Sequence, residues 1–298
     1  MSKSLYTILL IFIVGLFVIS AISFTIIPTN QTTKSTKVRE VKVDTVENKK
    51  PKLNILNKDK YEQVSWAYYL KDPVLLAIET APFSLFVIDV ENENTVFTKE
   101  QISKLQKTKK VFAYLSLGDA EDYRSYWKPL WNQKKPKWLG NEHPLWKGNF
   151  SVQDLLNKEW LEITKQQLDN VISVGYDGIV ISGLGLPDSN KFLTKIQEYL
   201  KSKKSSLKVY VQDYIYADSK LIDGVVKQGL IYNIDGSSSK ATQQELKELL
   251  KYKNEKKEIL VVEYVTGEKW EQAKKIIQKY EFSGYSGPLE LNVIRFKQ

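Results

Sequence analysis

The side chains that could do chemistry in this chain are carboxylates, arginine, tyrosine and tryptophan. The 298 residues include no cysteine and one histidine, His143. A disulfide, a thiolate nucleophile and a cysteine-ligated zinc site are therefore excluded, and so is a metal site built from three histidines. A Ser-His-Asp triad would depend on His143 alone. In the segment NEHPLW this residue is better interpreted as a hydrogen-bonding loop residue than as a catalytic base.

Polar side chains follow several apolar, strand-like runs at the point where each run ends. The carboxyl ends of parallel strands meet at one edge of a sheet or one mouth of a barrel, so these side chains would gather in one place. A single one of them could be an ordinary turn residue, but five or more together predict a site. The residues are Asp89, Ser116 to Glu121, Ser182, Gln212, Asp213, Gln228, Glu263 and Tyr264.

The elements that would position this ring alternate along the chain. Several strands are apolar on both faces, as in a buried parallel sheet, and amphipathic segments separate them. Eight strands in about 240 residues predict a (β/α)8 TIM barrel, with a doubly wound open sheet as the alternative. Thr98 and Gln101 have the spacing of a helix capping box. The expected strands are 64–70, 85–90, 111–117, 178–182, 209–213, 224–230, 259–265 and one between 282 and 294, and the expected helices include 98–108, 158–174, 190–201, 242–252 and 268–280.

The longest predicted connection, from Gly118 to Asn157, contains four tryptophans: Trp127, Trp131, Trp138 and Trp146. Long connections in compact domains are usually functional, and flat indole rings stack well on sugar rings. The alternative is that these aromatic rings simply cap the barrel. Arg124 follows Glu121 by three residues, so we expect the two to pair on a helical turn.

The N-terminal part predicts an exported protein. The segment from Leu5 to Ile27 contains no charged residue and is long enough for a transmembrane or signal-anchor helix. A cleaved signal peptide and a buried core helix are the alternatives. Most of the net charge of +9 comes from residues 31–60, with nine Lys/Arg against four Asp/Glu, so the remainder gives little reason to expect a nucleic-acid partner. We expect an anchor at 1–28, a flexible basic linker at 29–60, with an edge strand at 38–43 as the alternative, and the barrel domain at 61–298.

Several motifs together resemble one enzyme family. LSLGDAEDYRSYW, PKWLGNEHPLWKGNFSV, GYDGIVIS, DGVVKQGLIY and LVVEYV are similar to the endo-α-1,4-polygalactosaminidases, known as glycoside hydrolase family 114. The resemblance covers most of residues 61–298, and the SLGDAEDYR block is its most specific part. It implies an exported TIM-barrel hydrolase that acts on galactosamine-rich polysaccharide without a cofactor or a metal.

The resemblance also implies where catalytic carboxylates should lie. One family carboxylate ends the strand that follows G-[FY]-D-G, and the other follows the DG-x-x-K segment. Here those positions are Ser182 and Gln228, and the Gln-Asn pair of the family is Gln212-Asp213. Asp213 and Glu263 are the candidate substitutes, because both end strands. The residues expected to bind substrate are Asp89, Asp119, Glu121, Tyr123, Arg124, Trp127, Trp146, Asp177, Gln212 and Tyr264.

Glycoside cleavage needs an acid and a second carboxylate that acts as base or nucleophile. The preferred hypothesis is therefore a barrel on the outer side of the membrane that binds an amino-sugar polymer with impaired or no hydrolysis. An active glycosidase that uses Asp213 and Glu263, and a cell-envelope scaffold without sugar affinity, are the two alternatives. The sequence favours a polysaccharide partner and a membrane contact through the N-terminal segment.

Overall fold

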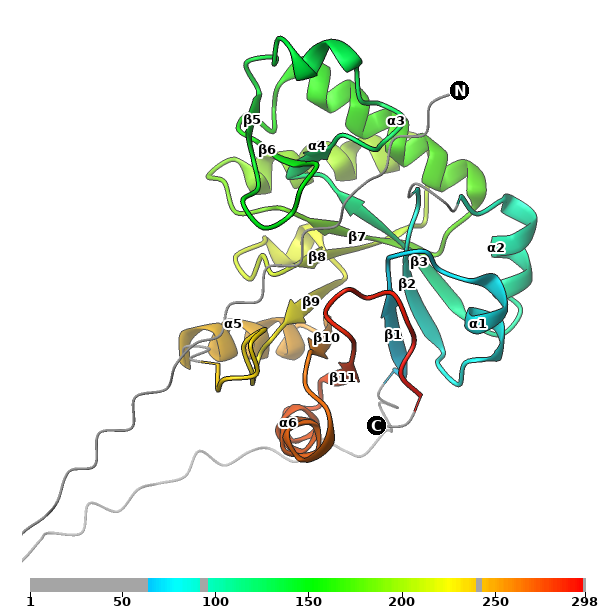
Figure 1. Cartoon of the computed structure of the whole chain (residues 1–298), viewed down its shortest axis with the longest axis vertical. Helices are drawn as coiled ribbons and strands as arrows, with labels where there is room; N and C mark the ends of the chain where they lie inside the picture. The colour runs from blue at the N-terminus through cyan, green and yellow to red at the C-terminus, as the bar shows by residue number, and fades with distance from the viewer. Residues whose placement is uncertain (1–63, 92–95, 240–242, 297–298) are drawn as a thin grey trace, which may run out of the picture. The chain divides into compact units, whose positions relative to one another are not determined.

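The structure, a computed structural model, describes residues 64–91, 96–239 and 243–296. Eight parallel strands follow one another in chain order, and only short antiparallel strands interrupt the series (Figure 1). An open doubly wound sheet would reverse its strand order at the centre, so the predicted barrel is confirmed. The strands are β1 (Trp66–Tyr69), β2 (Leu85–Asp89), β3 (Lys110–Ser116), β7 (Gly178–Ser182), β8 (Lys208–Gln212), β9 (Gly224–Gln228), β10 (Glu258–Glu263) and β11 (Ser283–Ser286).

The strands form because their apolar runs can be buried on both faces. All five residues of β2 and all five of β7 are buried, as expected for strands that face the barrel core on one side and the helices on the other. At the seam between β1 and β11 the indole of Trp66 donates to the carbonyl of Ser283 at 2.9 Å. The seam is also covered by the C-terminal segment, because the backbone N–H of Leu70 donates to the carbonyl of Leu291 at 2.9 Å.

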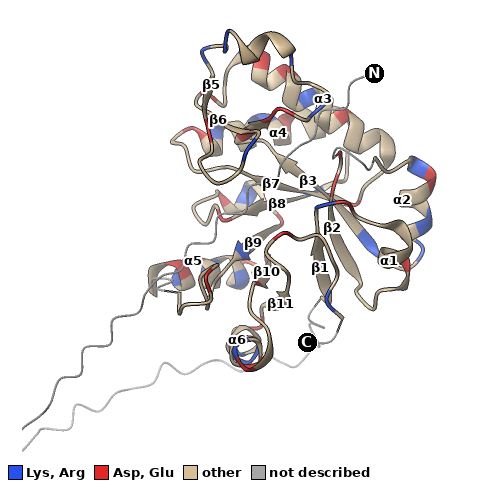
Figure 2. Ribbon diagram, viewed as in Figure 1, with Lys and Arg blue, Asp and Glu red and all other residues tan. Residues whose placement is uncertain are grey.

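In the described part of the chain, six α-helices lie outside the strands (Figure 1). The helices carry both basic and acidic residues (Figure 2). The predicted capping box is confirmed, since Thr98 accepts from the backbone N–H of Gln101 and the Gln101 side chain accepts from that of Thr98. Asn157 caps the predicted helix 158–174 and Gly175 ends it in a left-handed conformation. The helices are α1 (Leu75–Thr80), α2 (Lys99–Leu105), α3 (Lys158–Val174), α4 (Ser189–Ser202), α5 (Gln243–Asn254) and α6 (Gly267–Lys279).

The barrel departs from the regular pattern in two connections. Between β8 and β9 the chain forms only a 3-10 turn, Ser219–Leu221. Between β3 and α3 it forms an excursion that includes a small antiparallel sheet, which the sequence had given only as a long connection. Its strands are β4 (Asp119–Glu121), β5 (Leu139–Glu142) and β6 (Asn149–Val152), paired in the order β4-β6-β5.

Two Asp-Gly pairs make equivalent hydrogen bonds to the neighbouring strand at the amino ends of the strands. The carboxylate of Asp177 accepts from the backbone N–H of Val111 at 2.8 Å, and that of Asp223 accepts from Val209 at 2.9 Å. In each pair the aspartate N–H also donates back to the carbonyl of the same valine. Asp177 was expected to bind substrate, but it precedes β7 and so lies at the end of the barrel opposite the strand termini that carry the polar ring.

The glycine of each pair makes room for an aromatic ring inside the barrel. A Cβ on Gly178 would lie 2.8 Å from the ring of Phe112, and one on Gly224 would lie 2.4 Å from the ring of Tyr210. The two rings pack edge to face with centroids 5.1 Å apart. The GYDG and DGVV motifs therefore have a structural role in the packing at this end of the barrel.

The predicted anchor, linker and alternative edge strand at 38–43 lie outside the described residues. Within 64–91, 96–239 and 243–296, none of the helices combines the length and the apolar character that crossing a membrane requires.

We expect Asp177→Ala to lower the free energy of unfolding by about 1–3 kcal/mol, because the N–H of the buried Val111 would lose its acceptor. Urea denaturation of the full chain measures this. Asp188→Ala is the control, since 50% of the Asp188 side chain is exposed and its ion pair with Lys191 lies at the surface. Equal stability of the two variants would contradict the fastening role of Asp177.

Candidate functional site

A cavity of about 570 Å³ lies at the carboxyl ends of the strands; we call it the bowl. Its size is within the range of small-molecule sites, about 300–1,000 Å³. Strand ends, the excursion and the C-terminal segment all contribute to its wall. The lining residues are Leu70, Lys71, Asp72, Asp89, Tyr114, Ser116, Asp119, Glu121, Tyr123, His143, Trp146, Asn149, Ser182, Gly183, Gln212, Gln228, Ile234, Tyr264, Leu289, Glu290 and Leu291.

Ser182 and Gln228, the positions where the family resemblance places carboxylates, both line the bowl. The Ser182 hydroxyl donates to the hydroxyl of Tyr114 at 2.7 Å. Burial raises the pKa of Tyr114 far above its ordinary value, so this phenol stays neutral and cannot serve as a base for the serine. The structure thus brings an unactivated hydroxyl and a carboxamide to one cavity.

Two tyrosines lie at the strand ends beside them; Tyr114 lines the bowl and the fully buried Tyr68 packs against it. Tyr68 donates its hydroxyl to the side-chain oxygen of Gln212, and its ring packs edge-on against Tyr114 with centroids 6.1 Å apart. Burial raises the pKa of Tyr68 well above its ordinary value. Sequence reasoning missed both residues. Tyr114 lies two positions before Ser116 in β3, so the alternation of side chains along a strand could have placed it on the same face.

A buried ion cluster supports one side of the bowl. The guanidinium of Arg124 binds both oxygens of Asp89, at 2.6 and 3.0 Å, and its Nε donates to Glu121 at 2.6 Å. The predicted pairing of Arg124 with Glu121 is confirmed, but the predicted helical turn is not, because Glu121 ends β4 and the chain turns directly after it. Burial raises the pKa of Asp89 and of Glu121, and the charge of Arg124 opposes the rise. Because Arg124 also donates to the carbonyl of Glu91, it acts as a support behind the bowl.

The excursion enters the bowl at a point of very close backbone approach. A Cβ on Gly118 would lie 1.8 Å from the carbonyl oxygen of Gly183, the residue after Ser182. Gly183 has a φ of +78°, and a Cβ there would lie 2.7 Å from the carboxylate of Asp119. Asp119 is thereby held beside the end of β7. Burial raises its pKa, and the nearby His143 opposes the rise.

The four tryptophans of the excursion have different positions. Trp127, Trp131 and Trp138 pack edge to face in series, with neighbouring centroids 5.2 and 5.1 Å apart, and form the excursion's own core together with Trp160. Trp127 is therefore not among the residues that line the bowl. Trp146 does line it, and 49% of its surface is exposed.

His143 orders the turn that presents Trp146. Its Nδ1 accepts from the backbone N–H groups of Leu145 and Trp146, both at 3.2 Å. The hydrogen-bonding role expected for this histidine is confirmed.

The two candidate substitute carboxylates lie elsewhere. Glu263 is fully buried and accepts from the backbone N–H groups of Ile231 and Tyr232, at 2.7 and 3.1 Å. It holds the start of the loop from β9 to α5 and lines neither of the two principal cavities. Asp213 faces a neighbouring cavity, where it accepts from Lys227 and from the backbone N–H of Gln228.

The bowl is acidic. Five carboxylates and one lysine line it, and Arg124 stands behind two of the five. The rim adds apolar side chains, Ile234 and Leu289, which the sequence gave no reason to single out. Such a lining suits a cationic ligand with hydroxyl groups and apolar ring faces. No cluster of three or more potential metal-binding side chains occurs among the described residues.

Comparison with known proteins gives a consistent assignment. The model of glycoside-hydrolase family GH114 matches residues 45–290. An uncharacterized protein of Methanocaldococcus jannaschii is 29% identical over 279 residues, covering 79% of this chain and 80% of its own. One from Thermotoga maritima is 28% identical over 253 residues, covering 75% and 78%.

Solved structures share the fold. Ega3 of Aspergillus fumigatus, in a complex with galactosamine, superposes with a TM-score of 0.61 at 17% identity and covers 78% of this chain and 95% of its own. The glycoside hydrolase domain of PelA from Pseudomonas aeruginosa gives a TM-score of 0.59 at 12% identity, covering 76% and 96%.

Burial raises the pKa of Glu263 to about 7 from an ordinary 4.5. In this interval the folded chain keeps a proton that the unfolded chain has lost, so the stabilisation is complete below about 4.5 and disappears as the pH rises through about 7. We expect the stability of the wild type relative to Glu263→Gln to fall by about 3 kcal/mol over that range. Urea denaturation at several pH values measures the difference.

The control is Glu162→Gln, which alters an exposed glutamate paired with Lys165. It should follow the wild type at every pH. A constant difference between the wild type and Glu263→Gln would mean that Glu263 does not titrate in this window.

Proposed function

The chain belongs to glycoside-hydrolase family GH114, and we propose that its barrel binds an amino-sugar polysaccharide with impaired or no hydrolysis. We place the barrel on the outer side of the membrane, tethered by the uncharged run from Leu5 to Ile27. Protease added to intact cells should degrade the barrel. Protection of the barrel until the cells are lysed would count against this location.

One observation carries the proposal: an acidic bowl remains while Ser182 and Gln228 occupy its two presumed catalytic positions. Carboxylates on the wall would attract the ammonium groups of a partly deacetylated polymer, and the exposed face of Trp146 could stack on a sugar ring. Ega3, which shares the fold, is known in a complex with galactosamine, and this agrees with such a ligand.

The chemistry of the two positions argues against efficient cleavage. A carboxamide cannot release a proton near neutral pH, so Gln228 cannot act as the general acid. A serine needs an activating base to act as a nucleophile, and the one hydrogen-bond partner of the Ser182 hydroxyl among the described residues is the neutral phenol of Tyr114. Loss of general acid–base help alone typically slows a reaction by about 10²–10⁴-fold.

The active-glycosidase alternative has little geometric support. Glu263 is turned into the backbone of the loop after β9 and is fully buried, and Asp213 faces the neighbouring cavity. The scaffold alternative differs from the proposal only in sugar affinity, so a binding measurement separates the two.

We expect the full chain to bind α-1,4-linked galactosamine oligomers without releasing shorter products, as measured by calorimetry and chromatography. Trp146→Ala should weaken binding by about tenfold, the usual order for one stacking aromatic ring. Tyr216→Ala is the matched control, because Tyr216 is also an exposed aromatic residue and lies outside the bowl. Absence of binding by the wild type would favour the scaffold, and release of products would favour an active enzyme.

We expect Ser182→Asp combined with Gln228→Glu to give measurable hydrolysis of the same oligomers, because the pair would restore an acid and a second carboxylate. Each single change should remain inactive, since cleavage requires both groups. If the double variant binds the oligomers and still does not cleave them, then residues other than Ser182 and Gln228 also differ from those that an active hydrolase requires.

A further inference from the structure

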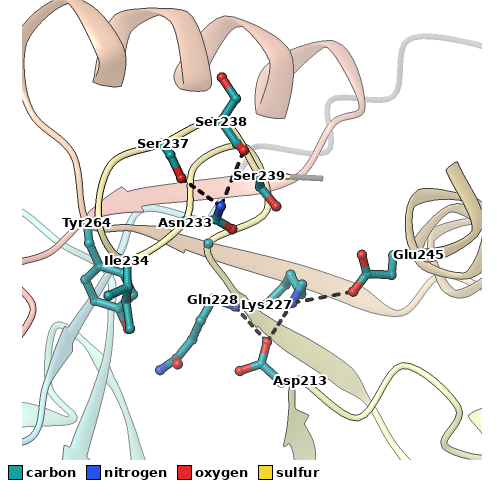
Figure 3. A pocket seen from close by; sticks show the side chains of 11 residues that line it. Asp213, Lys227, Gln228, Asn233, Ile234, Ser237, Ser238, Ser239, Glu245 and Tyr264 are labelled. Atoms are coloured by element: carbon teal, nitrogen blue, oxygen red, sulfur yellow. Dashed lines mark hydrogen bonds and ion pairs between the residues drawn. The ribbon is translucent and has the colours of Figure 1, made fainter. Parts of the chain in front are cut away.

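A second cavity, of about 680 Å³, lies beside the bowl at the ends of β8 and β9 (Figure 3). The proposed function does not use it. Gln228, Ile234 and Tyr264 line both cavities, so the two share a wall. We call it the Asp213 cavity. Its other lining residues are Asp213, Lys227, Gly229, Asn233, Ser237, Ser238, Ser239 and Glu245.

One side of the Asp213 cavity is rich in hydroxyl and amide groups, which come from Asn233 and Ser237 to Ser239 (Figure 3). Bonds within the loop hold this side in place. The Asn233 amide donates to the Ser237 hydroxyl at 2.9 Å, and that hydroxyl donates to the carboxylate of Asp235 at 2.6 Å. A ligand would therefore meet a wall that is already ordered, which lowers the entropic cost of binding.

The opposite side carries Asp213 in an unusual backbone conformation. Its φ is +55°, in the left-handed region that only a few non-glycine residues adopt. In this conformation one carboxylate oxygen, Oδ1, accepts from both Lys227 Nζ and the backbone N–H of Gln228, at 3.1 and 3.0 Å. The other oxygen, Oδ2, has no partner among the described residues, and 37% of the side chain is exposed.

The charge of the Asp213 cavity matches that of the bowl. Lys227 lies between Asp213 and Glu245, at 3.1 and 3.9 Å, so two carboxylates face one ammonium group. Among the described lining residues, both cavities therefore carry more carboxylates than cationic side chains. At their shared edge Ile234 and Tyr264 offer apolar surface, and 57% of Ile234 is exposed.

We propose that the Asp213 cavity binds a neighbouring unit of the amino-sugar chain whose other unit occupies the bowl, with Oδ2 of Asp213 accepting from the ammonium or a hydroxyl group of that unit. This inference rests on the proposed function, since it requires the bowl to bind such a chain. Ile234 and Tyr264 contact the linkage between the two units, and the hydroxyl-rich loop after β9 covers the outer unit.

The test compares galactosamine monosaccharide with its α-1,4-linked tetramer on the full chain by calorimetry. Asp213→Asn keeps an acceptor for Gln228 and removes the negative charge. We expect it to weaken binding of the tetramer by about tenfold, because the hydrogen bond from the ligand would lose its charged acceptor. Binding of the monosaccharide, which the bowl alone accommodates, should stay within twofold.

Two further variants separate the explanations. Asp119→Asn, in the bowl, should weaken both ligands. Asp188→Asn, which removes an exposed carboxylate that also pairs with a lysine, should weaken neither. If Asp213→Asn leaves the tetramer unaffected, or weakens both ligands equally, the second binding position is refuted while the proposed function stands. If the wild type binds neither ligand, the proposed function itself fails.

Discussion

The buried guanidinium of Arg124 is the interaction on which the shape of the bowl depends. It joins Asp89, at the end of a barrel strand, to Glu121, in the excursion, and only 5% of Arg124 is exposed. A charge buried this deeply must be paired, and removing one partner of a buried pair costs about 3–5 kcal/mol. This ion cluster therefore fixes the excursion relative to the barrel. It thereby helps to set where Asp119 and Trp146 meet the bowl.

The contact between Gly118 and Gly183 is the second constraint on the same region. The excursion can leave β3 only by passing the end of β7 at a distance that allows no Cβ. Both constraints act through backbone and buried charge, and neither involves the side chain of Ser182 or Gln228. The residues at these two positions can thus differ from those of an active hydrolase while the bowl keeps its form, and the proposed binding function requires this.

Sequence periodicity was sufficient for the strands and for most helices. Helix 158–174 has the predicted bounds, and Thr98 with Gln101 forms the expected capping box. Local spacing also predicted the pairing of Glu121 with Arg124, because residues three apart meet on one turn. These successes share a cause: each depends on residues close together in the chain, or on apolar runs that can be buried in only one way.

The sequence by itself thus determined the barrel, the ring of polar strand ends and the presence of Ser182 and Gln228 within it. Only the tertiary structure decided which of these side chains meet. It placed Asp177 at the opposite end of the barrel, Trp127 inside the excursion and Glu263 against a loop backbone. Strand position sets which end of a barrel a residue reaches. The final direction of a side chain also depends on its hydrogen-bond and packing partners. For Asp177 and Glu263 these partners lie more than 30 residues away in the chain, so they are known only once the chain has folded.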